Sequence, residues 1–487
     1  MGGNNYMDGI LGITQETIKN VTKAVKDQQL NKAITLSQGL QGYNLEAPAK
    51  QLVPFLSPLR NMIPRKVSKT GSSTHWKAIT AVDAAGKATA IEGTRGNGMS
   101  YSVEDKVAIY RNISLQDNVT LEAEAAGRNF EDVKALSATN LLLRVMTEEE
   151  KIILGGNVSS LGTVSAPTVT TATTGGSIAE NTYSCKVAAL TLVAANRISL
   201  NQQVANLVLG VGATDSSNNA ISGAYDGVTA ASAATSQATT GAASTLTLTA
   251  TPVKGALAYA WFIGTAAGSE TLQIVTTNSA VTLTALVSGG TVAPTADGSG
   301  DPLSFDGIIP QIISGSGYYI DKANGQLTKA SGGVQELDDL NSYLFNHYKI
   351  GPTRYLVSEQ LHKDITAAVV AGAGAPTLFV NNTEKNDITG NYLVRQYVNK
   401  SYGGQIIKIE THPWLPNGTM VAMCDTVPYP NANIPSVMEI ECGYDYRQIE
   451  YAFTSPKYEF EVRTYEALKH YFPAAQAIIT NVKAGIA

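Results

Sequence analysis

The chain has 487 residues, about three times the length of a typical domain, so two or three folding units are expected. Charged residues make up only 15% of it, against roughly 25% in ordinary globular proteins, and the net charge is −5. This composition does not support tight or sequence-specific nucleic-acid binding, which needs concentrated Lys and Arg. A large surface so poor in charge is typical of a protein that buries much of its exterior against copies of itself.

The sequence contains no recognisable catalytic, nucleotide-binding or metal-binding motif. The five histidines form no HxxxH or HExxH, and there is no GxSxG or GxxxxGK[ST]. The three cysteines lie far apart without a CxxC, at Cys185, Cys424 and Cys442. We therefore predict no enzyme activity, no metal and no cofactor. Three consecutive acids, Glu148 to Glu150, are interpreted as an exposed face at the end of a solvated helix.

The N-terminus combines a polar segment with a proline-rich one. Residues 8–38 have a loose helical rhythm of apolar positions, which predicts an arm with little core of its own. The following stretch LVPFLSPLRNMIPR contains Pro54, Pro58 and Pro64, which forbid a continuous helix and a central strand. This apolar segment must lie on another surface, either of the same subunit or of a neighbour. No segment reaches the roughly 18 apolar residues of a membrane helix, and no signal peptide is recognisable.

A long hairpin is predicted next. THWKAITAV (74–82) reads as a strand, and alternate positions from Tyr101 to Ile113 predict a second strand, with a Gly-rich tip between them. An isolated two-stranded hairpin is marginal in water, so this one needs a partner surface. Residues 119–154 have apolar side chains near helical spacing and predict a long helix that ends at the glycines of 155–157.

The composition changes between residues 158 and 300, where only 8 of 143 residues are charged. Short alternating runs such as TYSCKVAAL, STLTLTATPV and AYAWFIGT, separated by turn residues, predict an inserted antiparallel sandwich with Trp261 and Phe262 in its core. From Leu303 onward the composition again resembles that of the residues before the insert. The pattern there predicts a helix over 336–347, a strand over 353–358, a helix from Glu359 and four strands in the C-terminal part.

In this order of elements the chain resembles the HK97-type major capsid proteins of tailed bacteriophages. LVPFLSPLRNMIPR is similar to the segment that leads into the extended loop of that family, residues 74–113 to the loop, and the helix ending in EEEKIILGGN to the spine helix. FDGIIPQI (305–312) resembles the strand or turn where the peripheral domain resumes, and VRTYEALKHYFPAAQAII the final strand. The likeness covers roughly residues 20–157 and 301–487.

The resemblance implies an α+β, HK97-like capsid fold with an N-terminal arm, an extended β-hairpin loop, a long spine helix and peripheral and axial domains. The inserted sandwich is similar to immunoglobulin-like or fibronectin type III-like modules, and we expect it on the outer surface. The expected boundaries are 1–55 for the arm, 56–157 and 301–487 for the body, about 70–113 for the loop, about 119–154 for the spine helix, about 340–440 for the axial domain and 158–300 for the insert.

The same resemblance implies a major capsid protein that assembles into pentamers and hexamers and closes into an icosahedral head around double-stranded DNA. The expected partners are copies of itself, scaffolding and portal proteins, cement or decoration proteins and DNA bound without sequence specificity. A membrane is not among them. The expected location is the virion, after assembly in the host cytoplasm. The alternative is a β-rich phage tail or surface adhesin protein, with the insert as its binding part.

The residues expected at assembly contacts lie in the proline-rich segment and on the hairpin. Lys77 and Lys87 are also candidates for the covalent lysine crosslink of some shells in that family, although an ordinary surface lysine is the favoured interpretation. The full set is Pro54, Phe55, Leu56, Pro58, Leu59, Arg60, Trp76, Lys77, Lys87, Arg95, Tyr101 and Arg111.

Overall fold

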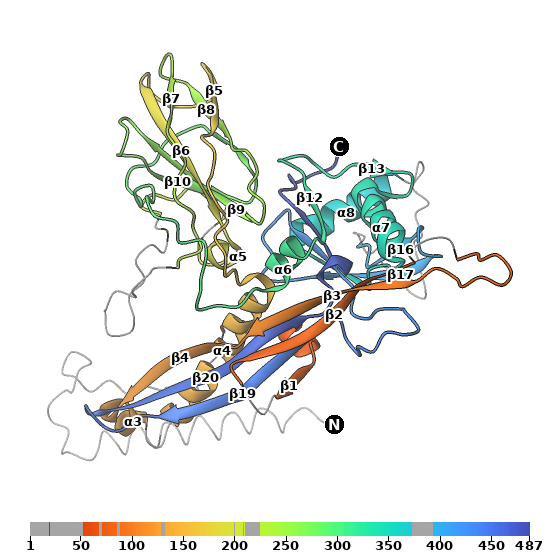
Figure 1. The fold of residues 1–487 in the computed structure, drawn as a ribbon. Coiled ribbons are helices and arrows are strands. Elements are labelled where there is room, and N and C mark those ends of the chain that lie inside the picture. Colours follow the sequence, from red (N-terminus) through yellow and green to blue (C-terminus); the bar gives the residue numbers. More distant parts are fainter. Residues whose placement is uncertain are drawn as a thin grey trace, which may run out of the picture. The chain divides into compact units, whose positions relative to one another are not determined.

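The computed structural model describes most of the chain outside its N-terminal arm (Figure 1). The chain divides into two compact units, and the helices and strands named here belong to the second, Val53–Ala126 with Asp132–Ala487, except for the last residue of one short helix, Gly127. The predicted arm lies outside the described residues except for Lys19 and the stretch from Leu52. The described residues are 19, 52–67, 71–84, 88–127, 132–198, 200–207, 209, 225–372 and 393–487.

A four-stranded sheet and one long helix form the first part of the body (Figure 1). The apolar side of helix α4 (Val133–Gly155) packs on the sheet through Val145 and Ile153, which meet Phe460 and Ile440 in one buried cluster. Burial of these side chains supplies the main driving force for joining helix and sheet. In spatial order the strands are β1 (Arg65–Val67), β19 (Met438–Glu450), β20 (Lys457–His470) and β4 (Arg111–Thr120).

The prediction of one helix over 119–154 is wrong at its start. Residues 119 and 120 end strand β4, because they pair with Tyr458 and Lys457 of β20. A short helix, α3 (Leu121–Gly127), follows, and α4 begins afresh at Val133. The Asp132 side chain caps α4 by accepting the Ala135 N–H at 3.0 Å. Its 23 residues span about 35 Å at about 1.5 Å per residue, and it ends at the predicted glycines.

The predicted hairpin is present as strands β2 (Ser73–Ala84) and β3 (Met99–Ile109), which form a two-stranded sheet. The second strand is shorter than expected. The chain turns at Tyr110, whose side chain is buried, and from Arg111 onward the residues belong to β4 and pair with β20. The period-two pattern continues across this turn, so the sequence did not reveal the change of sheet.

A six-stranded sheet with two helices forms the other part of the body. Leu337, Leu344 and Leu361 on the helices pack with Tyr355 and Ile407 of the sheet. The predicted helices over 336–347 and from Glu359 and the predicted strand over 353–358 are confirmed, and so is the α+β class. The stretch VRTYEALKHYFPAAQAII, expected as one final strand, is instead divided between β20, which ends at His470, and a strand of this second sheet that begins at Ala477. The strands are β12 (Tyr318–Asp321), β21 (Ala477–Thr480), β18 (Met420–Met423), β15 (Arg354–Val357), β17 (Gln405–Thr411) and β16 (Gln396–Asn399), and the helices are α7 (Gln335–Tyr348) and α8 (Glu359–Gly372).

Residues 305–312, expected as a strand or turn, instead lead into helix α6 (Ile308–Ser314). Ile308, Ile309 and Ile312 are buried in the core, at positions that share one side of a helix. Pro310 is tolerated because it lies in the first turn, where the backbone N–H groups have no partner within the helix. A small hairpin, β13 (Lys329–Ala330) and β14 (Gly333–Val334), precedes α7.

The stretch expected as a sandwich contains two sheets, ordered β10-β9-β6-β7 and β11-β8-β5. Trp261 and Phe262 are fully buried as predicted, and the Trp261 indole N–H donates to the Thr276 hydroxyl at 2.8 Å. The strands pair only with one another. They are β5 (Thr168–Ala172), β6 (Thr182–Leu190), β7 (Thr235–Ala238), β8 (Thr245–Thr249), β9 (Ala258–Gly264), β10 (Thr271–Thr276) and β11 (Ala280–Leu283), with a short helix α5 (Leu192–Ala195).

The core between α4 and β20 gives a direct stability test. Phe460→Ala removes a fully buried ring and should lower the free energy of unfolding by about 3–5 kcal/mol in chemical denaturation. Phe453→Ala is the matched control, because that ring is 61% exposed, and it should cost less than about 1 kcal/mol. Equal losses in the two variants would contradict the packing described here.

Candidate assembly surface

The hairpin β2–β3 contains one extra residue that changes which side chains share a face. Ile79 pairs with Val103, but the next pairs are Ala81 with Ser102 and Val82 with Tyr101. Thr80 is therefore an unpaired bulge residue. In a regular strand, neighbouring side chains alternate between the faces, so Val82 would lie opposite to Ile79. The bulge returns Val82 to the face of Ile79.

As a result, every large apolar side chain of the paired strands that is exposed lies on one face of the hairpin. Each of these seven side chains is between 50% and 64% exposed. Among the described residues of the hairpin, the ion pair on this face joins Lys77 and Asp105 at 3.5 Å, and these two charges cancel. We call it the apolar face of the hairpin, and it consists of Ile79, Val82, Met99, Tyr101, Val103, Val107 and Ile109.

The opposite face of the hairpin packs at its root on the body of the same chain. The Trp76 ring meets the Tyr471 ring edge to face at a centroid distance of 5.9 Å, and the Lys469 ammonium lies 5.3 Å from the Trp76 ring centre. A groove of about 340 Å³ beside this contact includes Arg111 and His470 in its lining. Complete burial lowers the pKa of His470 to about 3, so this imidazole is neutral. The root is therefore fixed by the chain's own residues, whereas the apolar face is not.

The proline-rich segment is anchored on its own subunit. Pro58 occupies the first position of a short helix, α2 (Pro58–Met62), where a missing N–H costs nothing. The Glu150 carboxylate accepts the N–H groups of Leu59 and Arg60 at 2.9 and 2.7 Å, which caps this helix from outside. The segment before it stays exposed, with Leu52 at 89%. The sequence allowed this segment to pack on its own subunit or on a neighbour, and in the structure its helix packs on its own subunit.

The interpretation of Glu148 to Glu150 as an exposed acidic face is wrong. The side chains of Glu149 and Glu150 are completely buried, and only that of Glu148 keeps some exposure. Glu148 pairs with Arg144 at 2.5 Å and with Lys151 at 2.9 Å. The three acids point in different directions because successive helical residues are rotated by about 100°.

Glu149 lies in a charged cluster where α4 meets β1, β19 and β20. Its carboxylate accepts hydrogen bonds from Arg65 and from the Tyr446 hydroxyl. Arg65 also donates to Glu466 at 2.7 Å and to Asp445 at 2.9 Å. Burial, reinforced by the neighbouring charge of Glu466, raises the pKa of Glu149 to about 8.

Glu150 is held by a histidine as well as by helix α2. The His412 Nε2 atom lies 2.8 Å from the Glu150 carboxylate, and both side chains are buried. The Trp414 N–H donates to His412 Nδ1 at 3.3 Å, so Nδ1 is an acceptor and the ring proton is on Nε2. Glu150 therefore joins α2, α4 and the segment after β17.

Sequence reasoning missed Arg65, Glu149, Glu150, His412 and Tyr446, which join these elements. One signal was available. The acids run directly into KIILGG, which carries three consecutive apolar residues, so a solvated helix end was a poor interpretation of that position.

Comparison with solved structures gives distant similarities over nearly the whole chain. The capsid of the Myoviridae phage XM1 is similar over 92% of this chain and 99% of that chain, with 7% sequence identity and a TM-score of 0.41. The capsid of a native GTA particle covers 93% and 99%, at 9% identity and a TM-score of 0.40. The holo-SrpI encapsulin complex of Synechococcus elongatus PCC 7942 covers 90% and 93%, at 8% identity and a TM-score of 0.38.

No protein-family model and no curated protein sequence matches the chain. Because the TM-scores to the solved structures lie below 0.5, the function is inferred from the chain's own residues and contacts.

The residues expected at assembly contacts fall into three groups. Trp76, Lys77, Arg95 and Tyr101 lie on the hairpin; Tyr101 belongs to its apolar face, and Lys77 lies on the same side of the sheet. Arg111 lies in β4 and donates to the Ser304 carbonyl at 3.2 Å. The proline-rich segment contributes the others: Pro54, Phe55, Leu56, Pro58 and Arg60 are exposed or half-buried there.

Two of the expected residues stand apart from these groups. Leu59 is only 1% exposed and belongs to the core, so its expected place on an assembly surface is wrong. Its backbone N–H is bound to Glu150 and its side chain faces inward. Lys87 lies outside the described residues.

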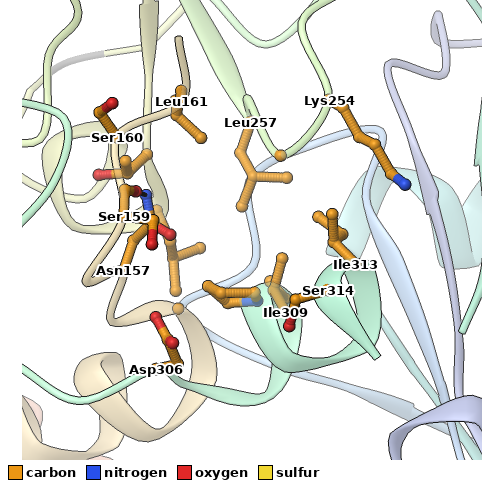
Figure 2. Close-up of a pocket in the computed structure, with 15 residues that line it drawn as sticks. Asn157, Ser159, Ser160, Leu161, Lys254, Leu257, Asp306, Ile309, Ile313 and Ser314 are labelled. Atoms are coloured by element: carbon orange, nitrogen blue, oxygen red, sulfur yellow. Dashed lines mark hydrogen bonds between the residues drawn. The ribbon is translucent and has the colours of Figure 1, made fainter. Parts of the chain in front are cut away.

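The cavity of Figure 2 offers no arrangement for catalysis. It has a volume of about 170 Å³, and Leu161, Leu257, Ile309 and Ile313 supply much of its lining. Its charged residues, Asp306 and Lys254, come from opposite sides of the cavity (Figure 2). In addition, the Asp306 carboxylate accepts the Val158 N–H at 2.8 Å. Its geometry fits a packing gap better than a reaction site.

In the part of the chain that the structure describes, His, Cys, Asp and Glu side chains form no group of three or more able to hold a metal ion. Its helices also include none with the length and apolar character needed to cross a membrane.

The capping role of Glu150 leads to a second stability prediction. Glu150→Ala leaves two helix N–H groups and His412 buried without their acceptor, so the free energy of unfolding should fall by about 3 kcal/mol in chemical denaturation. Glu359→Ala, at the exposed start of α8, removes a surface pair with Lys363 and should leave stability nearly unchanged. A loss at Glu150 no larger than at Glu359 would argue against the cap.

Proposed function

We propose that this chain is the major capsid protein of a tailed bacteriophage, which assembles into pentamers and hexamers that close into an icosahedral head around double-stranded DNA. The observation that carries the proposal is the apolar face of the hairpin. Its seven half-exposed side chains stand on a two-stranded sheet whose other face is already fixed, at the root, to the chain's own body.

A hairpin of this kind is stable only against another surface, because two strands alone bury too little apolar area. Copies of the same chain are the partner that its composition favours. With 15% charged residues, the chain has few charges to place on its exterior. On the hairpin face the charges of Lys77 and Asp105 cancel each other, so two like subunits can meet there without charge repulsion. A partner with a strong charge would find no complement on this face.

Several weak contacts per subunit make such a shell persistent. Besides the hairpin, the exposed segment from Val53 to Leu56 offers further apolar area just before helix α2. Each contact alone is weak, but once one is formed the others become intramolecular within the shell. We propose that Pro54, Phe55, Leu56, Pro58, Arg60, Trp76, Lys77, Lys87, Arg95, Tyr101 and Arg111 lie at or near these contacts.

We also propose that residues 158–300 are a separate immunoglobulin-like or fibronectin type III-like domain inserted into a body formed by 56–157 and 301–487, with an axial domain over about 340–440. The two ends of the insert lie side by side. The Asp301 N–H donates to the Asn157 carbonyl at 2.8 Å, and the Gly307 N–H to the Gly156 carbonyl at 2.8 Å. A domain whose chain enters and leaves at one point can be inserted without distorting its host.

The proposal extends to location and partners. The virion is the proposed site of the finished protein, with assembly in the host cytoplasm. Scaffolding, portal and cement or decoration proteins are its proposed partners, and packaged DNA is bound without sequence specificity. We propose no enzymatic activity and no cofactor for it.

Electron microscopy of the protein, expressed with its companion head proteins, tests the proposal. The wild type should form closed particles. Tyr101→Asp combined with Val103→Asp places two charges on the apolar face and should reduce the yield of closed particles at least about tenfold, because a buried unpaired charge costs several kcal/mol. Both residues are exposed, so the melting temperature of the subunit should stay unchanged.

Ser102→Asp is the matched control, because Ser102 lies between these two residues but on the opposite face. It should assemble like the wild type. Fibres, tail-like tubes or small monodisperse oligomers from the wild type would instead favour the adhesin alternative or refute the shell.

The inserted domain has its own test. Replacement of residues 158–300 by a short Gly/Ser linker should leave a body that unfolds cooperatively and still forms closed particles, because the ends to be joined already touch at Asn157 and Asp301. A lower melting temperature is expected, since Leu192 of the insert packs in the body's core. A body that fails to fold without residues 158–300 would contradict the domain division.

A further inference from the structure

The charged cluster around Glu149 has more acids than bases. Two of its carboxylates, Glu149 and Glu466, have no exposed side-chain surface, whereas Asp445 is 48% exposed. The groups that face Glu149 come from α2, β1, β19 and β20. They are Arg60, Arg65, Cys442, Asp445, Tyr446 and Glu466, and the neighbouring acid on α4, Glu150, is already occupied by α2 and His412.

A charge count leaves one negative charge uncompensated. Three carboxylates face two guanidinium groups, and one of these, Arg60, is 3.7 Å from Glu149. Burial raises the pKa of Cys442 to about 12 and raises that of Tyr446, so both stay neutral. Two adjacent ionised carboxylates without water are costly, and one proton between them removes the repulsion.

One buried hydrogen-bond acceptor of this cluster lacks a donor, and this proton could supply it. The Glu466 Oε1 atom is buried, and no hydrogen-bond partner is found for it among the described residues. Glu149 and Glu466 both accept from the guanidinium of Arg65, which brings the two carboxylates to one group, yet two ionised carboxylates cannot donate to each other. A proton on Glu149 supplies the missing donor. The Tyr446 hydroxyl does not compete for Glu466, because it donates to Glu149 and accepts from Arg60 Nε at 3.0 Å.

We infer that Glu149 carries a proton at neutral pH and donates it to Glu466, so that the joint between the end of helix α4 and strand β20 is stabilised by proton uptake. Loss of this proton to solvent leaves two ionised carboxylates between helix and sheet. The stability of this joint therefore decreases as the pH rises. This dependence requires no contact with another subunit and does not rest on the shell function.

The direction in which stability changes with pH follows from comparing the protons bound by the folded and the unfolded chain. The folded chain keeps the Glu149 proton up to about pH 8, whereas the unfolded chain loses it near pH 4.5. Between these values the folded chain binds more protons, so the stabilisation is complete below pH 4.5 and is lost as the pH rises toward 8. Each pH unit within this window multiplies the unfolding constant of this linkage by about ten.

Glu149→Gln tests the inference, because an amide N–H can donate to Glu466 at every pH. The ratio of unfolding constants, wild type over variant, is measured by chemical denaturation of the full chain in one fixed assembly state. It should rise about tenfold for each pH unit between about pH 5 and 7.5. Glu148→Gln is the control on the same helix and should give a ratio that does not change with pH.

Infrared spectroscopy supplies a second readout that needs no stable variant. The wild type at about pH 7 should show the carbonyl stretch of a protonated carboxylic acid, and this band should disappear as the pH passes about 8. A pH-independent ratio for Glu149→Gln, or no protonated-acid band at neutral pH, would overturn the inference. Neither result bears on particle formation, so the shell proposal stands or falls separately.

Discussion

The buried carboxylates at the end of helix α4 are the constraint on which the rest of the body depends. Glu150 holds helix α2 and His412, and Glu149 with Arg65 holds β1 against β19 and β20. Through α2 and β1 the chain is fixed just before it enters the hairpin. Since a buried charge without partners would cost several kcal/mol, these elements must come together as a set.

This arrangement separates two roles within one chain. The apolar cluster around Val145, Ile153 and Phe460 supplies much of the folding energy of this part of the body, and the buried polar groups decide which segments meet there. The hairpin contributes little to that core beyond its root at Trp76, so its apolar face can serve another surface. Strong internal fixation of the root and an uncovered outer face are both needed if the hairpin is to reach a neighbouring subunit in a defined direction.

The sequence was sufficient to predict those helices and strands whose pattern of apolar residues is local. The alternation from Tyr101 to Ile109 predicted the second strand of the hairpin, and the strands and helices after Arg354 follow from their periodicity. The sequence was insufficient where distant residues decide. Glu149 is buried by Arg65 and Tyr446, which lie 84 and 297 residues away, and no window of sequence shows that contact. Thr120 ends a strand because β20 pairs with it, although its neighbours have helical spacing.

The bulge at Thr80 has a consequence for the shape of the hairpin as well as for its pattern. A bulged strand twists more strongly than a regular one, so the surface that contains Ile79 and Val82 is curved. Flat sheet edges and flat sheets, the usual templates for indiscriminate stacking, fit such a curved surface poorly. The single extra residue that aligns the apolar side chains thus also narrows the range of shapes able to cover them.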